Sequence, residues 1–172
     1  MSKINIAIAG VGNCSSALVQ GVQYYIENPE DKIGLMFEDI GGYSAENFNF
    51  VVGFDVDSRK VGQRLNKAIY AKPNCNMEVF PPGHDMSCIA NESKVFRSPT
   101  MDGIAPHMNE LNENVTFLED NKTTPITASE YRAILKDRKV DVLLNYMPVG
   151  AEEAAAWHIE NAIRAGVHVV NC

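Results

Sequence analysis

The sequence has few basic residues and no long apolar run. Lysine and arginine number 15 against 22 aspartates and glutamates, which gives a formal net charge of −7. Because nucleic acids and anionic membranes repel a surface of this charge, it argues against general binding to either polyanion. No stretch reaches the roughly 18 apolar residues of a membrane-spanning helix, and the first residues lack a secretory signal. We therefore expect a cytoplasmic protein with neither a membrane nor a nucleic-acid partner.

Cysteine is also scarce, and the four cysteines are scattered along the chain at Cys14, Cys75, Cys88 and Cys172. This spacing is typical of reduced thiols rather than of a disulfide framework. Cys75 and Cys88, together with His84 between them, suggest zinc ligands at first sight. Their spacing matches no familiar ligand pattern and no second pair follows, so we predict no metal site.

Short apolar runs and amphipathic segments alternate along the 172 residues. The runs show no polar alternation, which is typical of strands buried on both faces of a parallel sheet. The alternation predicts one α/β domain, a doubly wound parallel sheet covering residues 1–172. The expected strands are 4–9, 50–54, 115–118, 140–146 and 167–172, and helices are expected over 13–28, from Ser58, from a capping box at Thr127 and Glu130, and from 152 to Gly166.

Residues 68–114 show no sustained period and are rich in proline and glycine. We predict an irregular insertion there, which forms part of an interface or covers a ligand. The last predicted strand, 167–172, has no following element to continue the layer. We therefore expect this chain to be the N-terminal part of a longer protein.

A glycine turn joins the first expected strand to the first expected helix, with the pattern Gly10-x-Gly12-x-x-Ser15. This matches the dinucleotide-binding fingerprint at two glycines and replaces the third glycine by a small serine. Gly10 permits a tight turn, Gly12 lets the backbone approach a diphosphate, and the N–H groups of Asn13, Cys14 and Ser15 attract the anion. The alternative is a turn that is purely structural.

An acidic residue at the end of the second strand is the next requirement of a dinucleotide site, and Asp55 lies there. It follows Gly10 by 45 positions instead of the usual interval of about 20. Asp55 predicts a contact to the adenosine ribose and favours NAD, because a carboxylate repels the additional phosphate of NADP. Arg59 and Lys60 leave NADP open, although they also suit the solvated first turn of a helix that Asp57 caps.

Ligands in such sheets lie beyond the carboxyl ends of the strands. This places Asn145, Tyr146 and Pro148 as candidates for the ribose or nicotinamide end, with Thr123 near the adenine. Tyr146 is alternatively a half-buried core aromatic. We expect the four histidines to be structural or solvated rather than catalytic: His84, His107, His158 and His168.

Five segments resemble, in order, the corresponding blocks of myo-inositol-1-phosphate synthases, also called inositol-3-phosphate synthases, of the bacterial and archaeal type. They are GVGNCSSALVQGVQYY, GLMFEDIGGY, VVGFDVDSRKVG, SPTMDG and NYMPVGAEEA. The resemblance implies a Rossmann-type NAD-binding domain followed in the family by an α+β domain that this sequence does not contain. It further implies that Asp102 approaches the nicotinamide, and that Asp55 and Tyr146 line the cofactor site.

The resemblance also implies an activity: an NAD-dependent isomerase that converts D-glucose 6-phosphate into 1L-myo-inositol 1-phosphate by oxidation, aldol cyclisation and reduction, in inositol and phospholipid biosynthesis. The family commonly forms homotetramers. Its catalytic lysines lie in the later domain, so the catalytic residues are unknown from this chain, which we expect to be inactive alone. The alternatives are another NAD(P)-dependent dehydrogenase with a similar N-terminal domain and a nucleotide-binding module that is not an enzyme.

Overall fold

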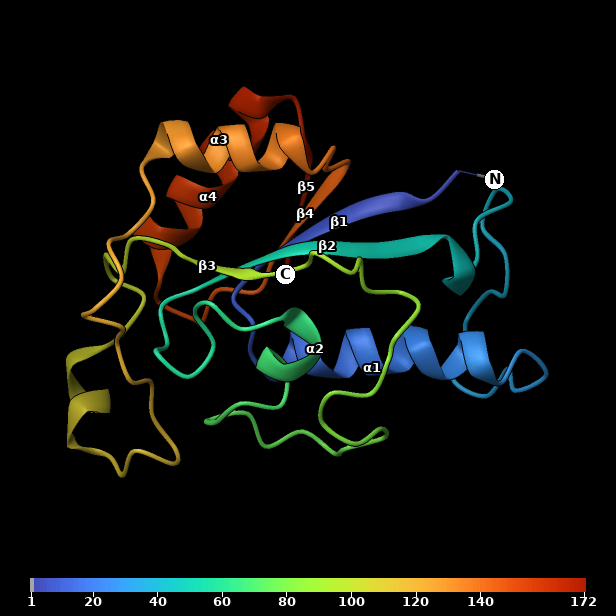
Figure 1. The fold of residues 1–172 in the computed structure, drawn as a ribbon, viewed down its shortest axis with the longest axis horizontal. Helices are drawn as coiled ribbons and strands as arrows, with labels where there is room; N and C mark the ends of the chain where they lie inside the picture. Colours follow the sequence, from blue (N-terminus) through green and yellow to red (C-terminus); the bar gives the residue numbers. More distant parts are fainter. Residues whose placement is uncertain (1) are drawn as a thin grey trace.

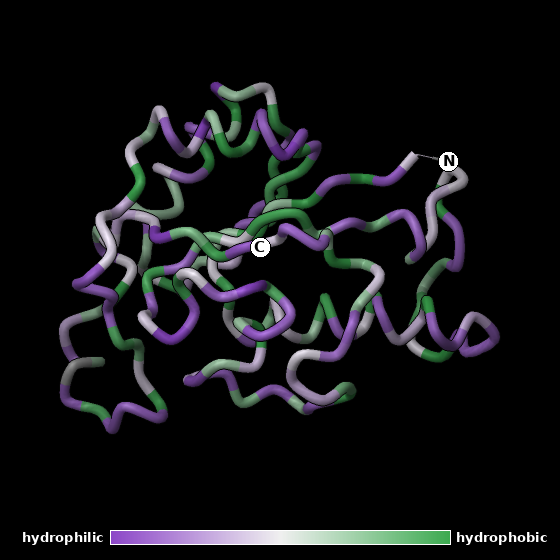
Figure 2. The backbone as a smooth tube through the Cα atoms, in the orientation of Figure 1, coloured by the Kyte–Doolittle hydropathy of each residue, from purple (hydrophilic) through white to green (hydrophobic). Residues whose placement is uncertain are grey.

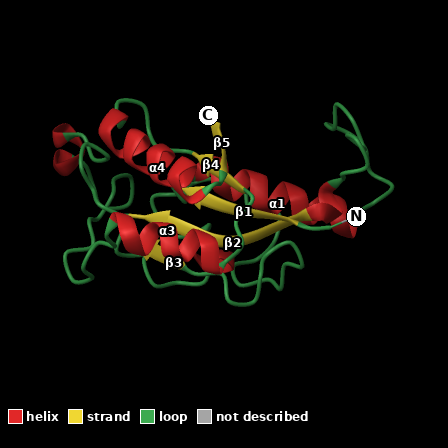
Figure 3. Ribbon diagram, turned by 90° about the horizontal axis from the view of Figure 1, so that it is seen from above, coloured by secondary structure: helices red, strands yellow, loops and turns green. Residues whose placement is uncertain are grey.

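The computed structural model describes residues 2–172, except for the side chain of Asn109. Within these residues, five parallel strands form one sheet in the order β3-β2-β1-β4-β5. Figure 3 shows β3 and β5 at opposite edges of the sheet. This strand order is that of the doubly wound, Rossmann-type fold, as predicted. The strands are β1 (Ile4–Ala9), β2 (Phe48–Asp55), β3 (Val95–Arg97), β4 (Val142–Asn145) and β5 (His168–Asn171).

Helices cover both faces of the sheet (Figure 1). One face carries α1 (Asn13–Glu27) and the short α2 (Leu65–Ala68), and the other carries α3 (Ala128–Asp137) and α4 (Glu152–Ala165). Two 3₁₀ turns, η1 (Ala45–Asn47) and η2 (Pro106–Glu110), lie in the connections. The strand order changes direction between β1 and β4, which makes this position the topological switch where ligands of such folds bind.

The central strand explains the two-layer core. Along β1, Ile6 and Ile8 enter the cluster beneath α1, while Ala7 and Ala9 enter the cluster beneath α3 and α4. All four side chains are buried. Figure 2 shows the apolar centre of β1 and β2 passing through the middle of the molecule. The apolar residues 6–9 are therefore buried between two helical layers, as a central parallel strand requires, and the strand predicted over 4–9 is confirmed, with Asn5 as its one polar residue.

Two predicted helix boundaries are confirmed by their capping contacts. At the start of α3, the Thr127 hydroxyl accepts a hydrogen bond from the Glu130 N–H, and the Glu130 carboxylate accepts one from the Thr127 N–H. At the end of α4, Gly166 adopts the left-handed conformation with φ 82°. Both contacts satisfy polar backbone groups that a helix end leaves without partners.

The third strand in chain order is not where the sequence predicted it. Residues 115–118 are not a strand, and Val115 is 60% exposed. The strand β3 lies instead at Val95–Arg97, inside the segment predicted to be irregular. It is three residues long and contains an arginine, so it carries too little apolar pattern to be recognised from the sequence. Its pairing with β2 and the burial of Val95 define it.

The helix predicted from Ser58 is also wrong at its start. Residues 58–62 form turns, and α2 begins only at Leu65. The Asp57 carboxylate accepts the Arg59 N–H at 2.9 Å, which bends the chain in a local turn. Gly62 then adopts a positive φ of 81°, which interrupts any continuing helix.

Candidate functional site

The turn after β1 is held against the end of β4. Gly10 has a φ of +87°, a conformation that other residues rarely adopt. A Cβ at this position would lie 2.6 Å from the Tyr146 carbonyl oxygen. On the other side, the Gly10 N–H donates to the Phe54 carbonyl at 2.9 Å. Gly10 is therefore required by close backbone packing among three strand ends, whatever the turn binds.

Gly12 differs, because no protein atom would lie within 4 Å of a Cβ at that position. It is the N-cap residue of α1, whose first turn has neither a side-chain cap nor an acidic residue. No described residue accepts a hydrogen bond from the backbone N–H groups of Gly12, Asn13, Cys14 or Ser15. Free N–H groups at the positive end of a helix suit an anion, and the open space at Gly12 allows one to approach.

Side chains of the turn form hydrogen bonds within the turn and to a neighbouring loop. The Ser15 hydroxyl donates to the Gly10 carbonyl at 2.6 Å, so the serine that replaces the third glycine also closes the turn. The Asn13 carboxamide oxygen accepts the Cys75 N–H at 2.8 Å, which joins α1 to the loop following α2. The Cys14 side chain is exposed. The turn residues predicted from the sequence are thus brought together in one place.

Asp55 lies beneath this turn and uses its carboxylate within the protein. Oδ2 accepts the Val11 N–H at 2.8 Å, and Oδ1 accepts the N–H groups of Val56 and Asp57 at 2.8 and 2.9 Å. The residue is only 7% exposed. The structure therefore brings Asp55 to the glycine turn, as the fingerprint requires, and makes it an acceptor for the turn's own backbone. Its predicted contact with a ribose stays a prediction.

The two cations that left NADP open are engaged within the protein. Lys60 is fully buried, with its ammonium nitrogen 3.8 Å from Asp55 Oδ2, rather than solvated on a helix turn. Arg59 is paired with Asp57 at 2.5 Å. Neither of these side chains is a free cation for an additional phosphate, and the buried position of Lys60 corrects the solvated role considered for it.

Arg59 also fixes the segment that precedes α3. Its guanidinium donates to the carbonyl oxygens of Glu113 and Thr116 at 2.7 and 2.8 Å. Its partner Asp57 is fully buried, and burial disfavours the charged carboxylate. The hydrogen bonds from Arg59 and from the Leu118 N–H outweigh that effect and hold the Asp57 pKa below its usual range. The pair therefore joins the end of β2 to residues 113–118.

Asp102 lies at the N-terminus of α4. Its two carboxylate oxygens accept the N–H groups of Glu153 and Ala154 at 2.8 and 2.9 Å. These hydrogen bonds lower the pKa of Asp102. A residue more than fifty positions away in the chain thus caps the helix, a role that the sequence prediction of a nicotinamide contact did not include. The nicotinamide contact stays a prediction.

The predicted candidates at the end of β4 have different surroundings. Asn145 is 2% exposed and donates to Asn171 Oδ1 at 2.6 Å, while its own Oδ1 has no partner among the described residues. Tyr146 is half-buried and packs against the core cluster beneath α1. Burial, followed by Cys172 and Cys14, raises its pKa, so the hydroxyl stays protonated at neutral pH. Pro148 is exposed, and its carbonyl accepts the Ala151 N–H.

Thr123 is exposed in the loop after Asp120, and its N–H donates to the Asp120 carboxylate at 3.2 Å. The Asp120 N–H in turn donates to the Val56 carbonyl at 2.8 Å. This places the loop beside the carboxyl end of β2, the end from which Asp55 reaches the glycine turn. No described contact joins Thr123 to the turn itself.

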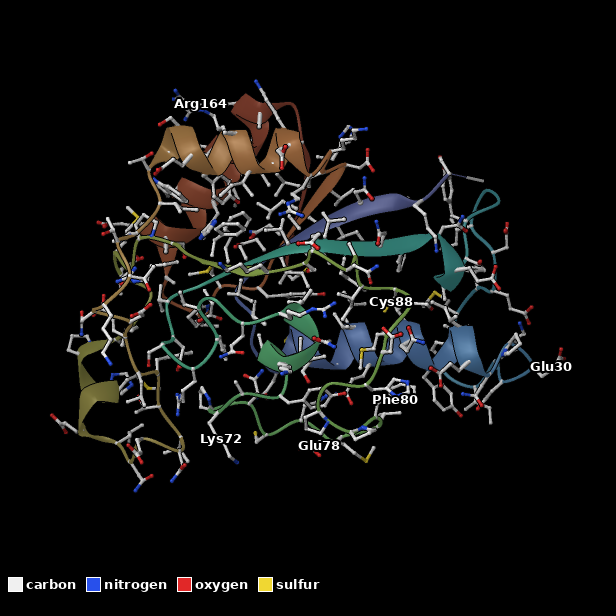
Figure 4. The ribbon with its side chains drawn as sticks, in the orientation of Figure 1. Glu30, Lys72, Glu78, Phe80, Cys88 and Arg164 are labelled. Carbon is white, nitrogen blue, oxygen red and sulfur yellow. The ribbon has the colours of Figure 1, made fainter. Side chains whose placement is uncertain are left out.

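The three residues considered as zinc ligands lie in separate environments. His84 stacks on Phe80 and pairs with Glu27 at 3.0 Å. Cys88 is buried, which raises its pKa to about 12. Figure 4 shows Cys88 between the sheet and α1, and Phe80 on the loop beyond that helix. Among the described residues, no three histidine, cysteine or acidic side chains gather as a metal-binding group.

None of the described helices is long and apolar enough to span a membrane.

Comparison with known proteins shows which proteins this chain resembles. No family profile matches the chain. The inositol-3-phosphate synthase of Mycolicibacterium smegmatis is 40% identical to it over 173 residues, which cover 98% of this chain and 43% of that protein. The chain is a relative of the inositol-3-phosphate synthases. The proteins of that name from Mycobacterium tuberculosis and Corynebacterium glutamicum are 38% and 37% identical, with matches over 99% of this chain. The chain spans only 43% of the length of these relatives, in their N-terminal part.

Two solved structures have a similar fold. The crystal structure of Ari2 matches 99% of this chain and 45% of its own chain, with a TM-score of 0.72 and 28% identity. A myo-inositol-1-phosphate synthase-related protein from Thermotoga maritima matches 96% of this chain and 41% of its own, with a TM-score of 0.60. At 15% identity, the second likeness shows the fold alone.

Proposed function

We propose that this chain is the NAD-binding part of an enzyme of the inositol-3-phosphate synthase type. The reaction would be the isomerisation of D-glucose 6-phosphate to 1L-myo-inositol 1-phosphate. One observation carries the proposal: in a relative of these synthases, the glycine turn presents N–H groups that have no acceptor among the described residues, beside an open position at Gly12. A turn with only a structural role does not require the second glycine to be free of neighbours.

The residues at the turn fit a dinucleotide. Gly10 and Ser15 fix its shape, Gly12 leaves space for a diphosphate, and the N–H groups of residues 12–15 would bind it. When bound, NAD supplies a hydride acceptor that becomes the hydride donor later in the same turnover. Asp55 beneath the turn is the acid of the NAD fingerprint, and Arg59 and Lys60 are already paired with Asp57 and Asp55, so neither is free to bind the additional phosphate of NADP.

The end of β4 is the proposed position for the other half of the dinucleotide. Asn145 ends β4, the strand next to β1, and Tyr146 and Pro148 follow it, across the topological switch from Asp55. The protonated Tyr146 hydroxyl can donate a hydrogen bond, while its ring packs against the core cluster beneath α1. Asp102 and Thr123 complete the proposed set from the segments after β3 and before α3.

The remaining parts of the proposal concern the whole enzyme. Developing oxyanions and the sugar phosphate require cationic groups in a closed site. We expect those groups in the part of the relatives that this chain does not match, which makes residues 1–172 inactive alone. A homotetramer and a cytoplasmic location belong to the same proposal, through the resemblance to the family.

Binding calorimetry with NAD and NADP tests the cofactor, and an assay for inositol phosphate tests the division of labour. We expect NAD to bind more tightly than NADP, and no turnover of D-glucose 6-phosphate by this chain. Absence of NAD binding would contradict the nucleotide site. Formation of inositol phosphate by residues 1–172 would overturn the assignment of the catalytic groups to another domain, and net accumulation of NADH with a substrate would identify a dehydrogenase instead.

A further inference from the structure

Three buried polar side chains lie together beneath the glycine turn: Asp55, Lys60 and Asn74. These three residues are 7%, 0% and 8% exposed, respectively. The Lys60 ammonium donates to Asn74 Oδ1 at 3.1 Å and lies 3.8 Å from Asp55 Oδ2. The three side chains come from the end of β2, the turn after it and the loop after α2. We call them the buried triad.

The buried triad holds the backbone of Val11, the residue between the two glycines of the turn. Asp55 Oδ2 accepts the Val11 N–H at 2.8 Å, and the Asn74 amide donates to the Val11 carbonyl at 3.1 Å. The same Asn74 amide also donates to the Ile69 carbonyl at 2.9 Å, which joins it to the end of α2. Both polar groups of Val11 are therefore fixed from below.

The contact to the Val11 carbonyl sets the direction of the next N–H group. Val11 C=O and Gly12 N–H belong to one planar peptide unit, and in a trans peptide they point in opposite directions. When Asn74 holds the carbonyl toward the protein interior, the Gly12 N–H points away from the buried triad. No described residue accepts this N–H. The proposed diphosphate would meet it there.

Lys60 determines which way round the Asn74 carboxamide lies. Because an ammonium group only donates, its contact selects the oxygen of Asn74 and leaves the NH₂ group for Val11. It also balances the charge of Asp55. Burying an ammonium group has a desolvation cost, so the buried ion pair is by itself weak evidence that Lys60 adds stability. Its specific effect here is on orientation.

We infer that Lys60 and Asn74 are positioning residues for diphosphate binding: without contacting the nucleotide, they hold the Val11–Gly12 peptide so that its N–H faces the ligand. The inference rests on the proposed function, and it assigns to two residues a role that the glycine fingerprint does not contain. It also gives Asp55 a task at the turn that is independent of any ribose contact.

The test compares ligands that have a diphosphate with one that does not. Dissociation constants for NAD, ADP and adenosine are measured by calorimetry or ligand-observed NMR for the wild-type chain, Lys60→Met and Asn74→Leu. The matched controls are Lys67→Met, on the exposed side of α2, and Asn76→Leu, on the same loop as Asn74. Circular dichroism establishes that each variant is folded.

We expect both triad variants to weaken NAD and ADP by about tenfold, because the binding amide is no longer pre-oriented, while adenosine affinity stays within about twofold. The controls retain wild-type affinities. A role confined to stability would lower the melting temperature without changing the ratio of ADP to adenosine affinity. Folded triad variants with wild-type NAD affinity, or with equal losses for ADP and adenosine, would overturn the inference.

Amide hydrogen exchange on the wild-type chain gives a second measurement if the variants do not fold. The Val11 N–H is expected to exchange as slowly as the N–H groups of β1, and the Gly12 N–H to exchange fast until NAD or ADP is added. Fast exchange at Val11 in the free protein contradicts the inference. A wild-type chain with slow Val11 exchange that binds neither NAD nor ADP contradicts the proposed function alone.

Discussion

The carbonyl oxygen of Tyr146 occupies the position next to Gly10 where any larger residue would need space. A Cβ on Gly10 would lie 2.6 Å from that oxygen and 2.9 Å from the Tyr146 carbonyl carbon. The Tyr146 N–H donates to the Ala9 carbonyl at 2.8 Å, immediately before Gly10. The glycine turn and the end of β4 are therefore fixed to each other across the topological switch.

This relationship predicts losses of stability of different size for two alanine substitutions. Gly10→Ala introduces a backbone clash and a strained positive φ, and we expect it to lower the free energy of unfolding by about 2–4 kcal/mol. Gly12 has a φ of −94°, which alanine can also adopt, and open space where a Cβ would lie. For Gly12→Ala we therefore expect the free energy of unfolding to fall by about 1 kcal/mol or less. Urea denaturation followed by circular dichroism measures both.

Binding separates the two glycines further. Gly12→Ala is expected to weaken NAD binding while the fold stays intact, because its methyl group enters the space left for the diphosphate. Gly21→Ala is the matched control, since its Cβ also meets no protein atom and it lies on the same helix. Unchanged NAD affinity in Gly12→Ala would show that the open position at Gly12 has no role in nucleotide binding.

The cap that Asp102 provides for α4 predicts a pH-dependent contribution. We expect Asp102→Ala to lower the melting temperature at pH 7, because two N–H groups of the first turn of α4 lose their acceptor. The folded-state pKa of Asp102 is lowered, so its contribution is present above the ordinary aspartate pKa and is lost as the pH falls below that value. The difference from wild type should shrink in acid.

Thermal unfolding between pH 7 and pH 3 measures this effect. Asp137→Ala is the control, because the Asp137 side chain is 80% exposed and forms a loose ion pair with Arg138 at 3.8 Å. Asp102→Asn is expected to fall between wild type and Asp102→Ala, since an amide oxygen still accepts one hydrogen bond but carries no charge. Equal melting temperatures for wild type and Asp102→Ala at pH 7 would contradict the cap.

His158 predicts destabilisation in mild acid. It is 1% exposed and shares a hydrogen bond of 3.1 Å with the Tyr131 hydroxyl, while its Nε2 has no partner among the described residues. Burial lowers its pKa from 6.5 to about 3. The unfolded chain therefore binds a proton below about pH 6.5 that the folded chain refuses, and each further pH unit toward pH 3 costs up to about 1.4 kcal/mol.

Urea denaturation at a series of pH values measures that slope. His158→Phe is expected to flatten it between pH 6.5 and pH 4, because the titrating group is gone and the aromatic contacts to Phe54 and Trp157 remain available. His168→Phe changes an exposed histidine on β5 and should keep the slope. An identical slope in His158→Phe and wild type would rule out His158 as its source.

The contacts of Arg59 predict a local change in dynamics. Arg59→Lys retains the charge beside Asp57 but cannot reproduce the planar set of donors that reaches Glu113 and Thr116. We expect amide exchange in residues 113–118 to accelerate by about tenfold, the equivalent of one lost hydrogen bond, with the sheet unchanged. Arg64→Lys, at an exposed arginine, is the control. Unchanged exchange in 113–118 would contradict this role of Arg59.

The regular repeat of strand, turn and helix could be predicted because its signals are local. Buried runs such as residues 4–9 and the capping box at Thr127 and Glu130 depend on neighbours in the sequence. The strand β3 could not be predicted, since three residues with an arginine become a strand only by pairing with β2. The helix expected from Ser58 failed for a related reason: the Asp57 carboxylate and Gly62 redirect the chain before α2 begins.

The candidate site divides in the same way. Gly10, Gly12 and Asp55 were recognised from the fingerprint, and the structure brings them together at the end of β1 and β2. Lys60 and Asn74 carried no recognisable signal, because a lysine in a polar segment predicts exposure and an asparagine in an irregular loop predicts nothing. Their contact beneath Val11 exists only after the loop following α2 folds against the turn.

The sequence alone determined the layered fold and the chemistry of the turn, because hydrophobic period, capping and glycine geometry act over a few residues. Only the tertiary structure decided which polar groups are free. It buried Lys60, gave Asp55 three backbone donors and turned Asp102 into the cap of a distant helix. Each of these outcomes depends on desolvation and on partners that lie far apart in the chain, and neither is encoded in local pattern.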